Sequence, residues 1–140
     1  MKAIEVRGLD HVVLRVEDLA RSLRFYVELL GCSEERRSDA LGLVQLRAGA
    51  SLIDLIVVAS PLGKLGGPAA GAQARNLDHF ALQLAHFDAA LIAARLEAFG
   101  VDPGDVAQRY GAQGMGPSMY VRDPDGNVVE LKGPPDPAQP

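Results

Sequence analysis

Two histidines occupy matching places in two similar stretches of the sequence. His11 is the third residue of the stretch LDHVVL, and His79 is the third residue of LDHFAL. Imidazole nitrogens are common ligands of catalytic metal ions, and a histidine that recurs in an internal repeat is a stronger candidate than a single one. The repeat therefore predicts that both histidines contribute to one kind of chemistry.

A carboxylate lies late in each half of the chain. Asp54 and Glu130 alternate with apolar neighbours in the last strand-like stretch of their halves, and His11 and His79 lie at the first strand of each half. Strand side chains alternate between two faces, so each half offers one histidine and one carboxylate on its more polar face. If the sheets curl, these faces line a groove. Imidazole and carboxylate ligands suit a divalent Ni, Zn, Fe, Mn or Co ion with open positions for water or substrate.

The elements that position these residues form a β-α-β-β-β unit that occurs twice. Each histidine-bearing strand is followed by an amphipathic stretch with an N-cap aspartate and a terminal glycine. We therefore expect an α+β fold in which two βαβββ repeats form a curved mixed-sheet groove with helices on the outer face. The other expected strands lie near Ser33–Ser38, Leu43–Arg47, Ser51–Val58, Val106–Tyr110, Ser118–Arg122 and Asn127–Lys132.

The chain divides into two modules, and each is too small to be expected to fold stably alone. A stretch rich in glycine and proline joins them, and a proline-rich tail follows the second. We expect a single domain over residues 1–140, built from module 8–59, linker 60–76, module 77–133 and tail 134–140.

Composition excludes several classes of function. The 140 residues are 48% hydrophobic and 23% charged, with a net charge of −4. No basic patch for nucleic acid is visible, and no apolar run approaches the roughly 20 residues of a membrane-spanning helix. Cys32 is the single cysteine, so an intrachain disulfide is impossible. We expect a cytoplasmic protein without nucleic-acid or membrane partners.

Two turns predict how strands pair. The sequence DPDGN is typical of a hairpin turn and predicts that Tyr120 lies opposite Glu130. In the first half, a turn through Gly49 predicts that Val44 lies opposite Asp54. Tyr120 is therefore a candidate active-site phenol beside Glu130.

A glycine-rich stretch in the second half, Gly111–Pro117, is expected to be a mobile loop over the groove. Arg109, Tyr110 and Gln113 lie in or beside it. We expect these side chains to be in reach of an anionic substrate.

These motifs resemble the vicinal oxygen chelate superfamily. This superfamily includes glyoxalase I, bleomycin-resistance proteins, fosfomycin-resistance thiol transferases, methylmalonyl-CoA epimerase and extradiol dioxygenases. The resemblance covers roughly residues 8 to 133 and is carried by the two LDH stretches, the helix RSLRFY leading to LLG, and DPDGNVVEL.

The resemblance implies a metal site at His11, His79 and Glu130, with Asp54 at the fourth position. Glyoxalase I has Glu at that fourth position and the epimerase has Gln, whereas Asp is one methylene shorter. Either Asp54 binds the metal directly, or it fails to reach the metal or binds through water, and the other three ligands then form a two-histidine, one-carboxylate site. That arrangement resembles the thiol transferases and extradiol dioxygenases.

The implied function is that of a glyoxalase I-like lyase or isomerase with one divalent metal ion per site. It would act through an enediolate on a small substrate with vicinal oxygens, such as a thiol adduct, with Glu130 or a metal-bound water as base and Tyr120 in the site. The alternatives are an extradiol-type dioxygenase, a thiol transferase, and a metal-free binding protein of the bleomycin-resistance kind. A homodimer is expected, with the site in one chain or shared by two.

Overall fold

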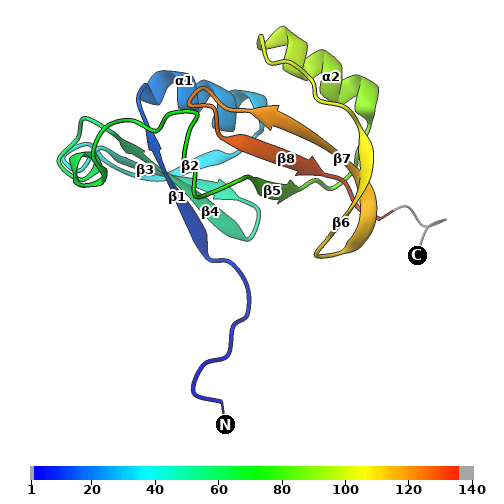
Figure 1. The fold of residues 1–140 in the computed structure, drawn as a ribbon, viewed down its shortest axis with the longest axis horizontal. Coiled ribbons are helices and arrows are strands. Elements are labelled where there is room, and N and C mark those ends of the chain that lie inside the picture. Colours follow the sequence, from blue (N-terminus) through cyan, green and yellow to red (C-terminus); the bar gives the residue numbers. More distant parts are fainter. Residues whose placement is uncertain (1, 136–140) are drawn as a thin grey trace. The chain divides into compact units, whose positions relative to one another are not determined.

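The computed structural model describes residues 2–135 and divides the chain into two compact units (Figure 1). The units are Met1–Ala70 and Gly71–Pro140, and each is described by itself. Their boundary falls inside the predicted linker 60–76. Of the predicted tail 134–140, residues 136–140 lie outside the described part of the chain.

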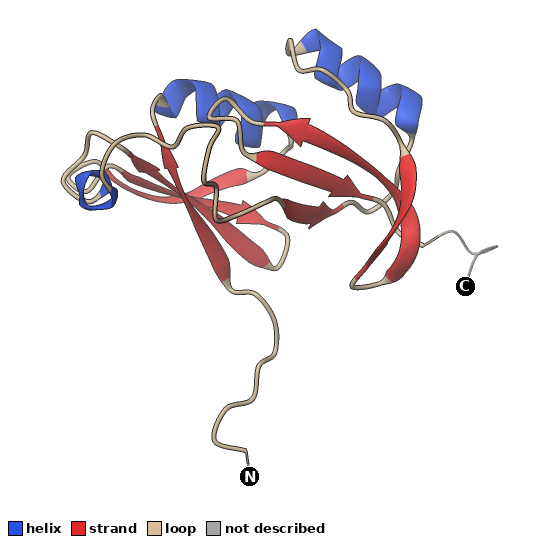
Figure 2. Ribbon diagram, in the orientation of Figure 1, coloured by secondary structure: helices blue, strands red, loops and turns tan. Residues whose placement is uncertain are grey.

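The first unit is a βαβββ module with a four-stranded mixed sheet (Figure 2). The spatial order is β1-β4-β3-β2; β1 runs parallel to β4, and the other pairs are antiparallel. A short 3₁₀ helix, η2, follows inside the predicted linker, so part of that segment is ordered. The elements are β1 (His11–Val16), α1 (Leu19–Leu23), the π-helical η1 (Arg24–Leu29), β2 (Ser33–Ser38), β3 (Leu43–Ala48), β4 (Ser51–Val57) and η2 (Gly63–Gly66).

The second unit repeats the same topology, which confirms the predicted βαβββ repeat. Its sheet has the order β5-β8-β7-β6, again with the first and last strands parallel. The prediction of a loop at Gly111–Pro117 is wrong, because β6 and β7 are joined there by a tight hairpin. The elements are β5 (Phe80–Gln83), α2 (Ala89–Ala98), β6 (Ala107–Gly111), β7 (Gly114–Arg122) and β8 (Val128–Lys132).

Both helical segments begin and end at the predicted signals. The side chains of Asp18 and Asp88 each accept a hydrogen bond from the backbone N–H three residues later, which satisfies a free donor at the helix start. The following Gly31 and Gly100 adopt φ values of 84° and 72°. Within residues 2–135, no helix is long and apolar enough to span a membrane.

Each sheet buries the face formed by alternate apolar side chains. In β4, Ile53 and Leu55 belong to this buried face, and Asp54 points to the opposite one, as predicted. Helix residues Phe25 and Tyr26 are also buried. The other buried apolar strand residues are Leu14, Val16, Val44, Leu46, Met119, Val121, Val129 and Leu131.

The predicted register is confirmed in the second unit and wrong by one residue in the first. Tyr120 pairs with Glu130 across β7 and β8. Asp54, however, pairs with Gln45 rather than Val44. The hairpin has a two-residue loop in which Gly49 takes a φ of 62°, whereas the prediction assumed one more loop residue. A polar side chain therefore shares the face of Asp54.

Candidate functional site

The first unit brings His11 and Asp54 to the same face of its sheet. Asp54 pairs with Val13 across β1 and β4, and His11 precedes Val13 by two residues. A hydrogen bond to Asp10 is the largest cause that raises the pKa of His11, and the charge of Asp54 raises it further. The imidazole is about half exposed, whereas Asp54 is only 4% exposed.

The Asp54 carboxylate has one satisfied and one unsatisfied oxygen. Oδ2 accepts a hydrogen bond of 3.1 Å from Nε2 of Gln45. Oδ1 is buried and has no hydrogen-bond partner among residues 2–135. A buried carboxylate oxygen without a partner is costly, and a cation at Oδ1 would compensate that cost. The donor set thus fits a metal ion, and Gln45 is a residue that the sequence analysis missed because of the register error.

The second unit brings His79 and Glu130 together. Nε2 of His79 lies 3.7 Å from Oε1 of Glu130, which is longer than a hydrogen bond. Two ligand atoms that are each about 2.1 Å from one metal ion lie at most about 4.2 Å apart. The separation is therefore compatible with a shared metal ion.

Each histidine is held by the aspartate that precedes it. Nδ1 of His11 is 2.6 Å from Oδ1 of Asp10, and Nδ1 of His79 is 2.7 Å from Oδ2 of Asp78. A carboxylate only accepts hydrogen bonds, so the proton lies on Nδ1 and, in the neutral ring, Nε2 is left as the metal-binding nitrogen. The sequence analysis quoted both LDH stretches without assigning a role to their aspartates.

Tyr120 packs in the same cluster as the second pair. Its ring lies edge-on to His79 at a centroid distance of 5.1 Å, and the guanidinium carbon of Arg109 lies 4.4 Å above its ring centroid. Burial raises the pKa of Tyr120, and a hydrogen bond to Glu130 and that residue's charge raise it further. The phenol is therefore protonated at neutral pH, and it lies beside Glu130 on the neighbouring strand.

Each unit thus supplies one pair of the predicted ligands. Within residues 2–135, no group of three or more His, Cys, Asp and Glu side chains is arranged to hold a metal ion. Neither unit by itself therefore completes the predicted set. Cys32 is buried, and burial raises the pKa of its thiol, so it stays protonated and is a poor ligand.

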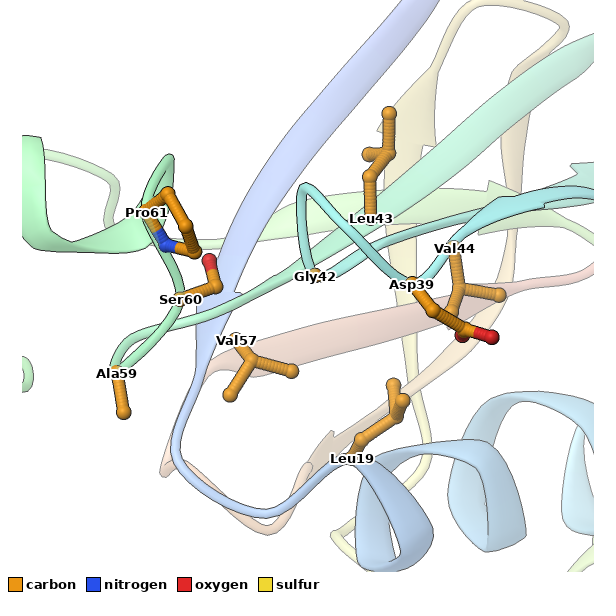
Figure 3. A pocket seen from close by; sticks show the side chains of 9 residues that line it. All are labelled: Leu19, Asp39, Gly42, Leu43, Val44, Val57, Ala59, Ser60 and Pro61. Atoms are coloured by element: carbon orange, nitrogen blue, oxygen red, sulfur yellow. The ribbon is translucent and has the colours of Figure 1, made fainter.

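The first unit also contains an open cavity of about 370 Å³ (Figure 3). It lies between Leu19 at the start of α1, the turn at Gly42 and the segment around Pro61. Its lining residues Val44 and Val57 belong to the helix-side face of the sheet, opposite the face that carries Asp54. The cavity is therefore separate from the candidate ligands.

Known proteins with a similar sequence and fold include a virulence protein and integron cassette proteins. The chain is 27% identical to virulence protein STM3117 of Salmonella typhimurium over 128 residues, which is 88% of this chain and 81% of that protein. The crystal structure of STM3117 aligns with a TM-score of 0.70, at 27% identity over 94% of this chain and 100% of that one. The integron cassette protein VCH_CASS1 of V. cholerae aligns with a TM-score of 0.69 at 27% identity, covering 94% of this chain and 98% of that one.

Lactoylglutathione lyase of Agrobacterium tumefaciens has a similar fold, with a TM-score of 0.62 at 21% identity over 90% of this chain and 92% of that one. The family model described as Glyoxalase/Bleomycin resistance protein/Dioxygenase superfamily matches residues 8–131. The match includes both LDH stretches and both candidate carboxylates. The chain therefore belongs to the Glyoxalase/Bleomycin resistance protein/Dioxygenase superfamily.

Proposed function

We propose that the protein is a divalent-metal-dependent lyase or isomerase of the glyoxalase I kind, acting on a small substrate with vicinal oxygens. One observation carries the proposal: each unit presents a histidine and a buried carboxylate on one face of its sheet, with Nδ1 of the histidine bonded to an aspartate. We propose that His11, Asp54, His79 and Glu130 together hold one Ni, Zn, Fe, Mn or Co ion. Imidazole nitrogen and carboxylate oxygen are suitable ligands for each of these ions.

The chain's own residues account for the proton transfers. Glu130 takes the proton from the carbon beside a substrate carbonyl, which gives an enediolate, and returns it to the neighbouring carbon. Tyr120, the cross-strand partner of Glu130, supplies a protonated phenol beside the carboxylate. A bound divalent ion supplies Lewis acidity toward the two substrate oxygens.

Turnover of the adduct of methylglyoxal with a small thiol tests this function. Protein stripped by a chelator is expected to be inactive, and activity should return on addition of one of the five ions. The related superfamily member lactoylglutathione lyase motivates the choice of a thiol adduct. Inactivity with every ion and every thiol tested would contradict the proposal.

A second candidate function uses only His11, His79 and Glu130 as ligands. The hydrogen bond from Gln45 to Asp54 favours it, because that bond already engages one oxygen of a short side chain. Such a site resembles those of extradiol dioxygenases and thiol transferases. Fe(II)-loaded protein that develops a catechol-dependent colour and consumes dioxygen would support this candidate. A protein that binds no metal would instead support a bleomycin-resistance type of binding protein.

We further propose that the protein works as a cytoplasmic homodimer on a small molecule. Superfamily membership supports both expectations. Sedimentation should give a mass near twice 14.8 kDa. A monomer in sedimentation that still carries full activity would contradict the dimer.

Replacing Asp54 with asparagine tests whether Asp54 is a metal ligand or has only a structural role. We expect metal affinity to fall about 10-fold or more, because the charged oxygen at Oδ1 is lost. We also expect the metal-free variant to be at least as stable as wild type, because a buried charge with an unsatisfied oxygen is removed. Isothermal titration and urea unfolding measure the two effects. Unchanged metal affinity would favour the three-ligand site. Asp39→Asn, at an exposed aspartate, is the control.

Removing either histidine-holding aspartate should weaken metal binding while leaving the fold intact. Asp10 and Asp78 are 91% and 97% exposed, so their side chains contribute little packing. We expect Asp10→Ala and Asp78→Ala each to lower metal affinity about 10- to 100-fold, as substitutions of such outer partners do. The melting temperature of the metal-free protein should not change. Wild-type affinity in both variants would show that these hydrogen bonds do not orient the imidazoles.

A further inference from the structure

The face of the second sheet that contains Glu130 carries more positive than negative charge. Strands β6, β7 and β8 contain Arg109, Arg122 and Lys132, and Glu130 is their one carboxylate. Lys132 is buried, and its Nζ donates to the backbone oxygen of Gly133 at 3.0 Å. Within residues 2–135, no ion pair joins any of the three cations to a carboxylate. This face therefore favours an anion beside Glu130.

Among these three cations, Arg109 is the one whose guanidinium packs on Tyr120, the cross-strand partner of Glu130. Its Nη1 donates to the backbone oxygen of Ser118 at 2.9 Å and to Oγ of the same residue at 2.8 Å. Its guanidinium also lies over the ring of Tyr120, which in turn lies opposite Glu130. These contacts fix the side chain, whereas an ordinary surface arginine extends into water. Nε and Nη2 make no hydrogen bond within the described residues and remain available as donors.

We propose that Arg109 binds an anionic group of the substrate, a carboxylate or a phosphate-like oxyanion. This inference rests on the proposed function, because it takes Glu130 as the reacting end of the site. Strands are about 5 Å apart, so the Arg109 guanidinium over Tyr120 lies about one to two strand spacings, or about 5–10 Å, from Glu130. The anionic group is therefore a few bonds away from the vicinal oxygens. A planar guanidinium with two free donors suits such an oxyanion.

Titration of metal-free protein with inorganic phosphate, and separately with malonate, tests this site. Amide chemical shifts in NMR spectra report the dissociation constant of each anion. We expect Arg109→Gln to weaken binding of the preferred anion about 10-fold or more and Arg109→Lys to weaken it less, because charge remains while the fork geometry is lost. Arg21→Gln, at an exposed arginine on α1 of the first unit, is the matched control and should bind within twofold of wild type. The anion that binds more tightly identifies the substrate class as phosphate-like or carboxylate.

The outcomes for this site and for the proposed function are separate. Wild-type anion affinity in Arg109→Gln, or binding of neither anion by wild type, would overturn the inference. Metal titration of the same variants tests the proposed function, and Arg109→Gln should bind metal like wild type. An anion site lost in Arg109→Gln, in a protein that binds no metal, would support the anion site while contradicting the metal-dependent function. The melting temperature of each variant verifies that it is folded.

Discussion

Replacing Glu130 with glutamine should lower kcat/KM for the thiol adduct by about 100-fold or more. Glutamine has nearly the same shape as glutamate, and its amide oxygen can still accept a hydrogen bond, so the fold should remain intact. The amide cannot take up the substrate proton. It also lacks the negative charge with which Glu130 would bind a metal ion beside His79. Metal affinity should therefore fall together with turnover. Steady-state kinetics and isothermal titration measure the two losses.

A matched control separates this effect from a general loss of charge. Glu35→Gln removes a carboxylate that is not one of the four candidate ligands and that forms an exposed ion pair with Arg47 at 2.9 Å. Exposed ion pairs contribute little, so activity and metal affinity should stay within about twofold of wild type. A Glu130→Gln variant that is as active as this control would contradict the role of Glu130 as base.

Truncating Leu55 to alanine should lower the free energy of unfolding by about 2–5 kcal/mol. Leu55 is fully buried, and β4 pairs with both β1 and β3, so the cavity would open in the middle of the first sheet. It also directly follows Asp54, and loss of packing on one face of the strand would loosen this candidate ligand on the other face. Urea unfolding followed by circular dichroism measures the change.

Leu65→Ala is the control for this substitution. Leu65 is 83% exposed, and its truncation should change the free energy of unfolding by less than about 0.5 kcal/mol. A Leu55→Ala variant as stable as Leu65→Ala would show that the side chain of Leu55 does not support the sheet.

The sequence was sufficient to predict the repeated topology and the register beside Glu130. The DPDGN turn carries strong local signals: Gly126 has a φ of 81°, and Asp123 accepts hydrogen bonds from the backbone N–H groups of Asp125 and Asn127. The turn after β3 has one glycine, Gly49, which suits a loop of two or three residues. That ambiguity produced the one-residue error at Asp54.

Other features depend on contacts that local patterns do not contain. The glycines before Ser118 are typical of a loop, but Gly116 lies inside β7, where a Cβ would come within 2.7 Å of the backbone oxygen of Pro134. The π-helical segment Arg24–Leu29 keeps an apolar stripe close to that of an α-helix, so periodicity did not distinguish it. The aspartate–histidine bonds depend on side-chain rotamers, which residue types alone do not specify.

The metal content of wild type and of two single-histidine variants tests the central claim most directly. If the two histidine–carboxylate pairs hold the same ion, wild-type protein should bind one divalent ion per protein chain. His11→Ala and His79→Ala should each abolish that binding. Elemental analysis after exhaustive dialysis against a metal-buffered solution measures the stoichiometry. Two ions per protein chain in wild type, or one ion per chain retained in either variant, would contradict a single centre built from His11, Asp54, His79 and Glu130.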